Sequence, residues 1–198
     1  EAKDRKTAFQ AFQSVVQLDP DHVAAWAQLA RLYMTEGQVN KADAALRETR
    51  RIKTEDPTVL DLIGTTLSLM GEHGIARAFY ARANTSRPGH PPFMLNLANN
   101  LVYHGDTDTA DIIFRDLLQV QPDTPQAHWA LAGSVRAADD SHIRELRALV
   151  AGHEPDPRGR AFSLSAVGKA FEDLQRGDVA FVAVCAGGAA RRGRMDCV

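Results

Sequence analysis

The sequence predicts an all-α protein in which about five helix hairpins stack into an α–α superhelix. The principal observation is a repeat of 34 residues, with starts at Val23, Pro57, Pro91 and Pro125. A second observation is the composition, because alanine is abundant and β-branched residues are scattered, which favours helices over strands. Hydrophobic residues make up 44% of the 198-residue chain and charged residues 24%, so the chain is expected to fold.

The first helix of each repeat is predicted from slots counted from these starts. Slots four, seven and eleven are mostly large and apolar, and slot eight is small; the second repeat has Leu60, Ile63, Leu67 and Gly64 there. Slots with this spacing fall on one stripe of a helix, so the stripe is expected to be buried. The small eighth slot predicts that a neighbouring helix crosses there at short distance. Proline at three of the starts fits a helix N-terminus, where its missing N–H is not needed.

A turn and a second helix follow in each repeat. A glycine is predicted to end the first helix, because glycine adopts the left-handed C-terminal conformation at low cost. A small residue early in the second helix is expected to pack against the first, and a large residue comes one turn later. The three sets are Gly37, Gly71 and Gly105; Ala42, Ala76 and Ala110; and Leu46, Tyr80 and Phe114.

The repeat pattern divides the chain into three regions. Residues 1–20 are predicted to form the second helix of an incomplete leading repeat, which favours further sequence upstream. Residues 21–184 are predicted to be the repeat array, with units starting near residues 23, 57, 91, 125 and 161. Residues 185–198 are expected to be an atypical or disordered tail.

The later repeats depart from the pattern. The fourth unit has Asp139 in place of the glycine and Arg144 in place of the small residue, and its second helix is expected to start near Ser141. In the fifth unit the second helix is not expected to continue past Val184. The glycine pair at 187–188 would lose too much backbone entropy in a helix.

These columns resemble the tetratricopeptide repeat family over roughly residues 6–182. The resemblance implies helix–turn–helix units in a right-handed superhelix, with the first helices lining its concave surface. In co-chaperone members of the family, a clamp of lysine and asparagine residues holds a terminal carboxylate. Among the corresponding slots here, only Arg31 and Asn96 are compatible with such a clamp, which disfavours that function.

The candidate ligand groove consists of first-helix slots that lie off the buried stripe. Asn96 and Asn99 are the most suggestive, because an amide offers both a donor and an acceptor and can hold the main chain of an extended peptide. The alternative is that both are surface amides without a ligand. Trp129 is either an aromatic anchor in the groove or a core residue in the slot that His128 would otherwise fill. The candidates are Arg31, Asp61, Thr65, Asn96, Asn99, Tyr103, Trp129, Arg136 and Lys169.

The residues contain no pattern that indicates catalysis or metal binding. Cys185 and Cys197 are too few for a disulfide framework or a zinc site and are interpreted as free thiols in a reducing compartment. The seven histidines lack the i,i+4 spacing of a helical zinc site, so each is interpreted as a turn or surface residue. Ser163 and Ser165 have no histidine at a recognisable spacing. We therefore expect a non-enzymatic chain without a cofactor or metal ion.

Charge and hydropathy narrow the class of partner. The formal net charge of -2 gives no long-range attraction to nucleic acid or anionic lipid. No apolar run approaches the ~18 residues that a membrane span needs, and no signal peptide is visible. The expected partner is a protein or peptide, with no nucleic acid and no membrane, and the expected location is cytoplasmic.

Two functional hypotheses follow. The first is a protein-interaction scaffold that binds an extended peptide or a protein partner in its concave groove. The second rests on residues 156–161, 167–174 and 177–178, which resemble the last repeat before the catalytic domain in bacterial sulfotransferases that carry tetratricopeptide repeats. That resemblance implies a non-catalytic amino-terminal region, which would present substrate to a catalytic domain absent from this chain.

Overall fold

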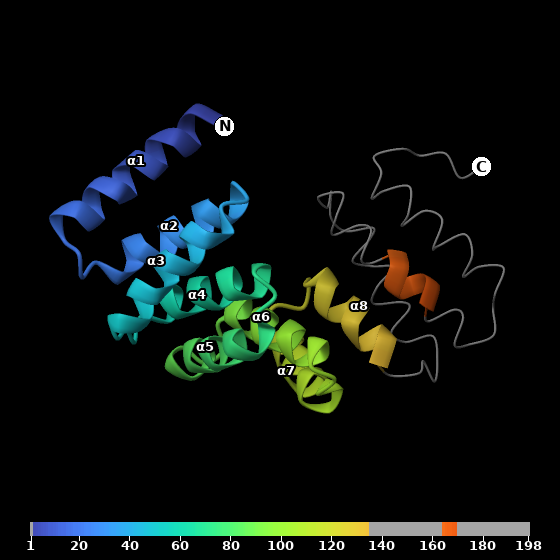
Figure 1. The fold of residues 1–198 in the computed structure, drawn as a ribbon. Coiled ribbons are helices and arrows are strands. Elements are labelled where there is room, and N and C mark those ends of the chain that lie inside the picture. Colours follow the sequence, from blue (N-terminus) through green and yellow to red (C-terminus); the bar gives the residue numbers. More distant parts are fainter. Residues whose placement is uncertain (1, 135–163, 170–198) are drawn as a thin grey trace, which may run out of the picture. The chain divides into compact units, whose positions relative to one another are not determined.

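The structure, a computed structural model, describes residues 2–134 and 164–169, and every regular element in these ranges is a helix (Figure 1). The chain divides into two compact units, Glu1–Asp106 and Thr107–Val198, and each is described by itself. The helix predicted near Ser141, the unit start predicted near residue 161 and the tail predicted for 185–198 lie outside the described residues.

The described part of the first unit consists of helices joined by short turns. The first helices α2, α4 and α6 begin 34 residues apart, at the predicted positions, and α1 spans the region predicted to be a leading second helix. The second helices are α3 and α5. The bounds are α1 Ala2–Leu18, α2 Val23–Thr35, α3 Val39–Arg51, α4 Pro57–Leu69, α5 His73–Ser86 and α6 Pro91–Tyr103.

The predicted glycines end the three first helices. Gly37, Gly71 and Gly105 have φ angles of 70°, 85° and 78°, in the left-handed region that other residues rarely adopt. The N–H of the residue after each glycine donates to a carbonyl five residues earlier, as in Glu72 to Leu67 at 2.9 Å. This bond is the 6→1 bond of a Schellman motif, which satisfies carbonyls at the helix end. The repeated glycine therefore sets the sharp turn into each second helix.

The close helix crossing predicted at slot eight is present in the second repeat. A Cβ atom added to Gly64 would lie 2.8 Å from Cε1 of Tyr80 on α5, so only glycine allows this approach. The predicted small residues of the second helices are also buried, and Ala42 and Ala76 have no exposed surface. The columns of small residues thus mark helix–helix contacts, as expected.

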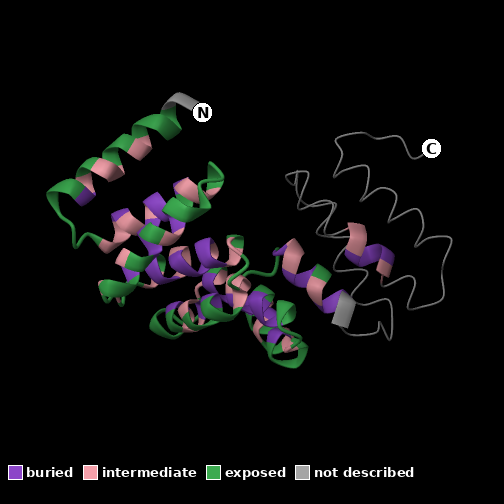
Figure 2. Cartoon of the chain, in the orientation of Figure 1, coloured by how far each residue is buried: buried purple, intermediate pink, exposed green. Residues whose placement is uncertain are grey.

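The buried stripe of the first helices is wider than predicted. Slots three and ten are buried in addition to the expected slots, because these helices are covered from more than one side: α2 packs against α1, α3 and α4, and α6 packs against α5 and α4. Figure 2 shows buried residues concentrated in α2, α4 and α6, whereas α1 is mostly exposed or intermediate. The additional buried residues are Ala25, Val59 and Phe93 at slot three and Leu32, Thr66 and Asn100 at slot ten.

The two polar residues at slot ten have hydrogen bonds that compensate for their burial. The Thr66 hydroxyl donates to the carbonyl of Leu62 at 2.9 Å, one turn back in the same helix. The Asn100 amide donates to the carbonyl of His73 at 3.0 Å, at the start of α5. Buried polar groups without partners cost free energy, and these bonds offset part of that cost, although Oδ1 of Asn100 has no partner among the described residues.

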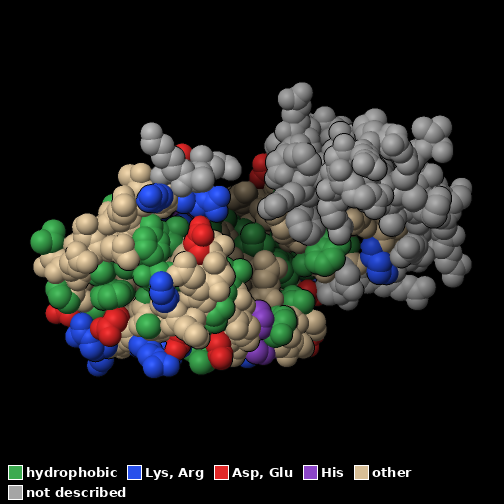
Figure 3. Space-filling model, turned by 45° about the horizontal axis from the view of Figure 1, so that its top comes forward, with side chains coloured by type: hydrophobic (Ala, Val, Ile, Leu, Met, Phe, Trp, Pro, Cys, Tyr) green, Lys and Arg blue, Asp and Glu red, His purple; other side chains and the backbone are tan. Residues whose placement is uncertain are grey.

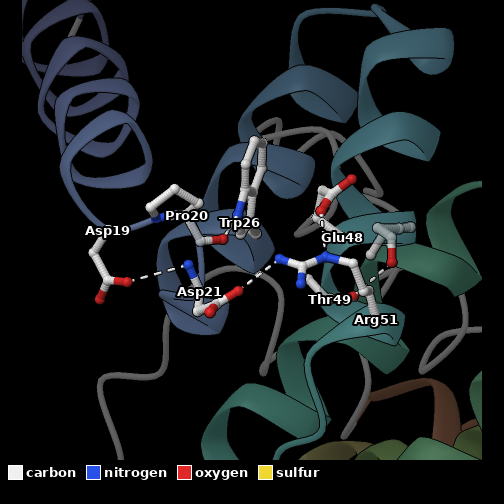
Figure 4. A network of polar contacts seen from close by, with 8 residues as sticks. Asp19, Pro20, Asp21, Trp26, Glu48, Thr49 and Arg51 are labelled. Atoms are coloured by element: carbon white, nitrogen blue, oxygen red, sulfur yellow. Dashed lines mark hydrogen bonds and ion pairs between the residues drawn. The ribbon is translucent and has the colours of Figure 1, made fainter.

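A polar network ties the α1–α2 loop to the end of α3 (Figure 4). The Trp26 indole N–H donates to the carbonyl of Pro20 at 2.8 Å. The Arg51 guanidinium donates to Asp21 at 2.7 Å and to Glu48 at 2.9 Å. These contacts fix the course of the loop that leads from α1 into the first complete repeat.

The described part of the second unit contains α7 Thr107–Val120 and α8 Pro125–Ser134, which pack together, and a helical segment at residues 164–169. Ala110, Phe114 and Leu117 are fully buried on α7. His128 on α8 is only 5% exposed, and its Nε2 lies 2.8 Å from the carbonyl oxygen of Pro122. The interpretation of His128 as a turn or surface residue is therefore wrong, because slot four is a core position in α8 as in α4 and α6.

Candidate functional site

The outward sides of α2, α4 and α6 form a continuous surface within residues 2–106, which we term the first-helix face. α2 packs against α4 and α4 packs against α6, and slot six of α6 contacts slot five of α4. The residues of this face are half-buried or exposed and come from slots five, six, nine, twelve and thirteen. They are Gln28, Arg31, Met34, Thr35, Asp61, Leu62, Thr65, Ser68, Leu69, Leu95, Asn96, Asn99, Val102 and Tyr103.

The first helices of this unit carry very few charges. Arg31 is the sole charged side chain of α2, Asp61 is the sole one of α4, and α6 has none. The second helix α3 differs, because six of its 13 residues are charged. Charged side chains of both signs gather along the lower left edge of the view in Figure 3. The first-helix face therefore consists mainly of amides, hydroxyls and apolar side chains.

Two predicted site residues, Asp61 of α4 and Asn96 of α6, are in direct contact. The amide Nδ2 of Asn96 lies 2.9 Å from Oδ1 and 3.0 Å from Oδ2 of Asp61, and both side chains are half-buried. Burial raises the pKa of Asp61, while the Asn96 hydrogen bond and the nearby His90 lower that pKa. Among the described residues, no lysine or arginine pairs with this carboxylate.

Thr65 and Arg31 also have neighbours on the first-helix face. The Tyr80 hydroxyl, from α5, lies 3.2 Å from Oγ of Ser68 and 3.5 Å from Oγ1 of Thr65. The exposed guanidinium of Arg31 lies 3.4 Å from Oε1 of Gln28, one turn away. Sequence reasoning grouped Tyr80 with the large residues of the second helices and missed its hydroxyl. The available signal was the tyrosine itself, since Leu46 and Phe114 occupy the same column.

Asn99 and Tyr103 lie toward the C-terminal half of α6. Asn99 is exposed, and no hydrogen bond to its side chain is found in the described part of the chain. Tyr103 is 66% exposed, and its ring stacks on that of His73 with a centroid separation of 3.7 Å and an interplanar angle of 31°. Leu69 and Val102 are also exposed, at 58% and 43%. This end of the face therefore presents apolar and aromatic surface next to a free amide.

The family model of the tetratricopeptide repeat matches residues 1–64. No curated protein matches the sequence. Among solved structures, PilW, a widely conserved type IV pilus biogenesis factor, is 19% identical with a TM-score of 0.72, covering 98% of this chain and 89% of that one. PilF of Pseudomonas aeruginosa is 18% identical with a TM-score of 0.69, covering 91% and 83%. YrrB, a tetratricopeptide repeat protein with an unusual peptide-binding site, is 14% identical with a TM-score of 0.65, covering 93% and 94%.

At these identities the likeness concerns the fold. The predicted all-α solenoid of tetratricopeptide-type helix hairpins is confirmed, and the family resemblance is supported. The resemblance to the repeat region of sulfotransferases rests on residues 156–161, 167–174 and 177–178. Almost all of these residues lie outside the described ranges.

The remaining predicted site residues belong to the second unit of this tetratricopeptide-type chain. Trp129 is 48% exposed on α8, and His128 occupies the buried slot beside it. Of the two interpretations of Trp129, the misplaced core residue is therefore wrong. Lys169 is half-buried in the helical segment at 164–169, and Arg136 lies outside the described residues.

A cleft of about 460 Å³ on another side of α2 was not predicted. Residues from the start of α1 and from the end of α2 line it, and Arg5 lies 3.9 Å from Glu36 across it. Phe9 meets Tyr33 edge to face, with ring centroids 5.0 Å apart. No sequence pattern indicates this cleft, because the cleft depends on the angle at which α1 meets the first complete repeat.

The described residues contain neither a helix that could span a membrane nor a group of residues that could bind a metal ion. None of the helices within 2–134 and 164–169 combines the length and hydrophobicity that are needed to cross a membrane. In the same ranges, no group of three or more histidine, cysteine, aspartate or glutamate residues is placed to hold a metal ion.

Proposed function

We propose that this chain is a non-enzymatic protein-interaction scaffold and that its first-helix face binds an extended segment of a partner protein. The observation that carries the proposal is the contrast in charge between the first helices and the second helix α3. A surface that stays in water is usually rich in charge, and residues at binding surfaces are less often charged. The face of α2, α4 and α6 has the second character, although α3 beside it has the first.

The side chains of the face fit the chemistry of an extended peptide. The exposed amide of Asn99 can donate to one main-chain group and accept from another, as an unpaired strand requires. Leu69, Val102 and Tyr103 provide exposed apolar surface for the peptide's side chains. The fold supports the same proposal, since YrrB, which resembles this chain in fold, is a tetratricopeptide repeat protein with a peptide-binding site.

Asn96 has a different role from the one that the sequence suggested. Its amide group already donates to Asp61, and in this proposal its role is to position that carboxylate. The main-chain contact that we expected from a pair of asparagines therefore falls to Asn99 in this proposal.

The test is peptide selection on the full chain, followed by a face variant. Helix axes ~8–10 Å apart and ~3.3 Å per extended residue mean that a peptide of roughly ten residues crosses three first helices. A displayed library of random linear peptides of that length is selected on the protein, and affinities are measured by fluorescence polarisation. Asn99→Arg places a bulky charge on the face and is expected to weaken binding at least about tenfold.

Asn40→Arg is the matched control, because Asn40 is also an exposed asparagine but lies on α3. It is expected to leave the affinity unchanged. If selected peptides bound the Asn99→Arg protein as tightly as the unmodified protein, the assignment of the face would be wrong.

The second hypothesis, a substrate-presenting region of a sulfotransferase, stays a prediction. It rests on sequence resemblance alone.

A further inference from the structure

Asp61 is the exceptional group of the first-helix face. It is the face's one anionic side chain, it is half-buried, and Asn96 from the neighbouring first helix donates to both of its oxygens. Arg31 is the one cation of the face, and its guanidinium lies against Gln28 on α2. The carboxylate therefore has a fixed position, with His90 nearby but no lysine or arginine paired with it among the described residues.

A partner that covers the face must compensate this carboxylate. Removing a half-exposed charge from the remaining water costs free energy unless an opposite charge or strong hydrogen bonds replace the lost hydration. A neutral peptide lying across Asp61 would therefore be disfavoured, whereas a peptide that brings a cation to it would not be. The rest of the face, including the half-buried Leu62 and Leu95, suits apolar neighbours of that cation.

The hydrogen-bond geometry leaves room for such a cation. An ionised carboxylate has about four lone-pair positions, and Asn96 occupies one on each oxygen. The remaining positions can accept from an ammonium group or, in bidentate fashion, from a guanidinium group. His90 is the other ionisable group beside Asp61; it stands at the N-cap of α6 with its ring against Phe93 at a centroid distance of 4.1 Å.

We propose that Asp61 determines the specificity of the first-helix face by receiving a lysine or arginine side chain of the bound segment, with apolar residues on either side of it. The proposal rests on the function proposed above and adds the chemical class of the partner. In it Asp61 contacts the ligand, and Asn96 is a positioning residue that acts through Asp61.

The test is a cycle of protein and peptide variants. The best selected peptide is compared with an analogue in which norleucine replaces its basic residue, on the unmodified protein and on Asp61→Asn. The unmodified protein is expected to lose about tenfold or more in affinity for the analogue, a typical effect of a charge-assisted hydrogen bond. Asp61→Asn keeps the shape and accepts from Asn96, and it is expected to bind the two peptides within about twofold of each other.

Asp43→Asn on α3 is the matched control, since Asp43 is also half-buried and pairs with Arg47 at 2.6 Å. It is expected to discriminate between the two peptides as the unmodified protein does. Thermal melts of all variants show whether each is folded before affinities are compared.

The outcomes separate this inference from the function on which it rests. Selected peptides that lack a basic residue, or that show no coupling to Asp61 while Asn99→Arg still blocks them, overturn the specificity role and leave the binding face intact. Peptides insensitive to both Asn99→Arg and Asp61→Asn overturn the face itself. Failure to select any peptide counts against both.

Discussion

α4 and α3, a first and a second helix of the same unit, differ in charge and in the extent of their burial. α4 has 13 residues with one charge and buries slots three, four, seven, eight, ten and eleven, so little of its surface is exposed. α3 has the same length, but it is strongly charged and buries only Ala42, Ala45, Leu46 and Thr49. The comparison teaches that the wide exposed surface of α3 is solvated by charged side chains, whereas α4 has a narrow outward strip that can be specialised for contact with another molecule.

The largest expected effect on the free energy of unfolding concerns the packing between first and second helices. Ala76 of α5 has no exposed surface, so Ala76→Leu would force extra methylene groups into a filled contact with the first helix. We expect a loss of about 1–3 kcal/mol in the free energy of unfolding, measured by urea denaturation. Ala78→Leu on the same helix is the control, because Ala78 is exposed, and it is expected to change stability by less than ~0.5 kcal/mol. Equal effects at the two positions would contradict the register of α5.

The contact between Tyr80 and α4 should have a smaller effect. Tyr80→Phe retains the ring that packs on Gly64 but removes the hydroxyl beside Ser68 and Thr65. The expected loss is about 0.5–1.5 kcal/mol, the usual net value of a hydrogen bond. Tyr33→Phe is the control: Tyr33 is half-buried, and no hydrogen bond to its hydroxyl is found in the described residues. A loss as large for Tyr33→Phe would mean that the cost reflects the ring environment and not the bond to the first helix.

The sequence alone predicted the parts of the fold that repeat. Helix starts, turn glycines and small packing residues return every 34 residues because each repeat meets the same geometric demand, so several copies can be compared. The widened stripe was missed because slot three varies in size and slot ten varies in polarity; slot ten is Leu32, Thr66 and Asn100 in three successive units. A polar residue can be assigned to a buried slot only when its hydrogen-bond partner is known.

The candidate site was predicted as a surface, but its internal contacts were not. Asn96 and Asp61 were both named, yet pairing them requires the offset between neighbouring first helices, which brings slot six of one helix to slot five of the previous one. Tyr103 was predicted to lie in the groove, and its stacking on His73 depends on the turn between α4 and α5, which the repeat pattern does not specify. Contacts between side chains of different repeats depend on the angle between helices, and one sequence does not determine that angle.

Asp61 gives the smallest expected change in stability and the sharpest test of what the first-helix face is for. Because burial raises the pKa of Asp61 in the folded protein, folding favours its neutral form, and the wild type loses stability as pH rises through that raised pKa. Asp61→Asn cannot ionise at this position, so its melting temperature is expected to rise relative to the wild type over the same pH range and to match it most closely in acid.

The affinity for a basic peptide should depend on pH in the opposite direction to stability. Binding requires the ionised carboxylate, so the affinity is expected to increase as pH rises through the same range. Asn96→Ala removes a hydrogen bond that lowers the pKa of Asp61, so the midpoints of both curves are expected to move to higher pH together. A merely structural Asn96 would weaken the fold without moving either midpoint. We expect a specificity residue on the first-helix face to behave in this way: its carboxylate lowers stability at neutral pH and strengthens binding at the same pH.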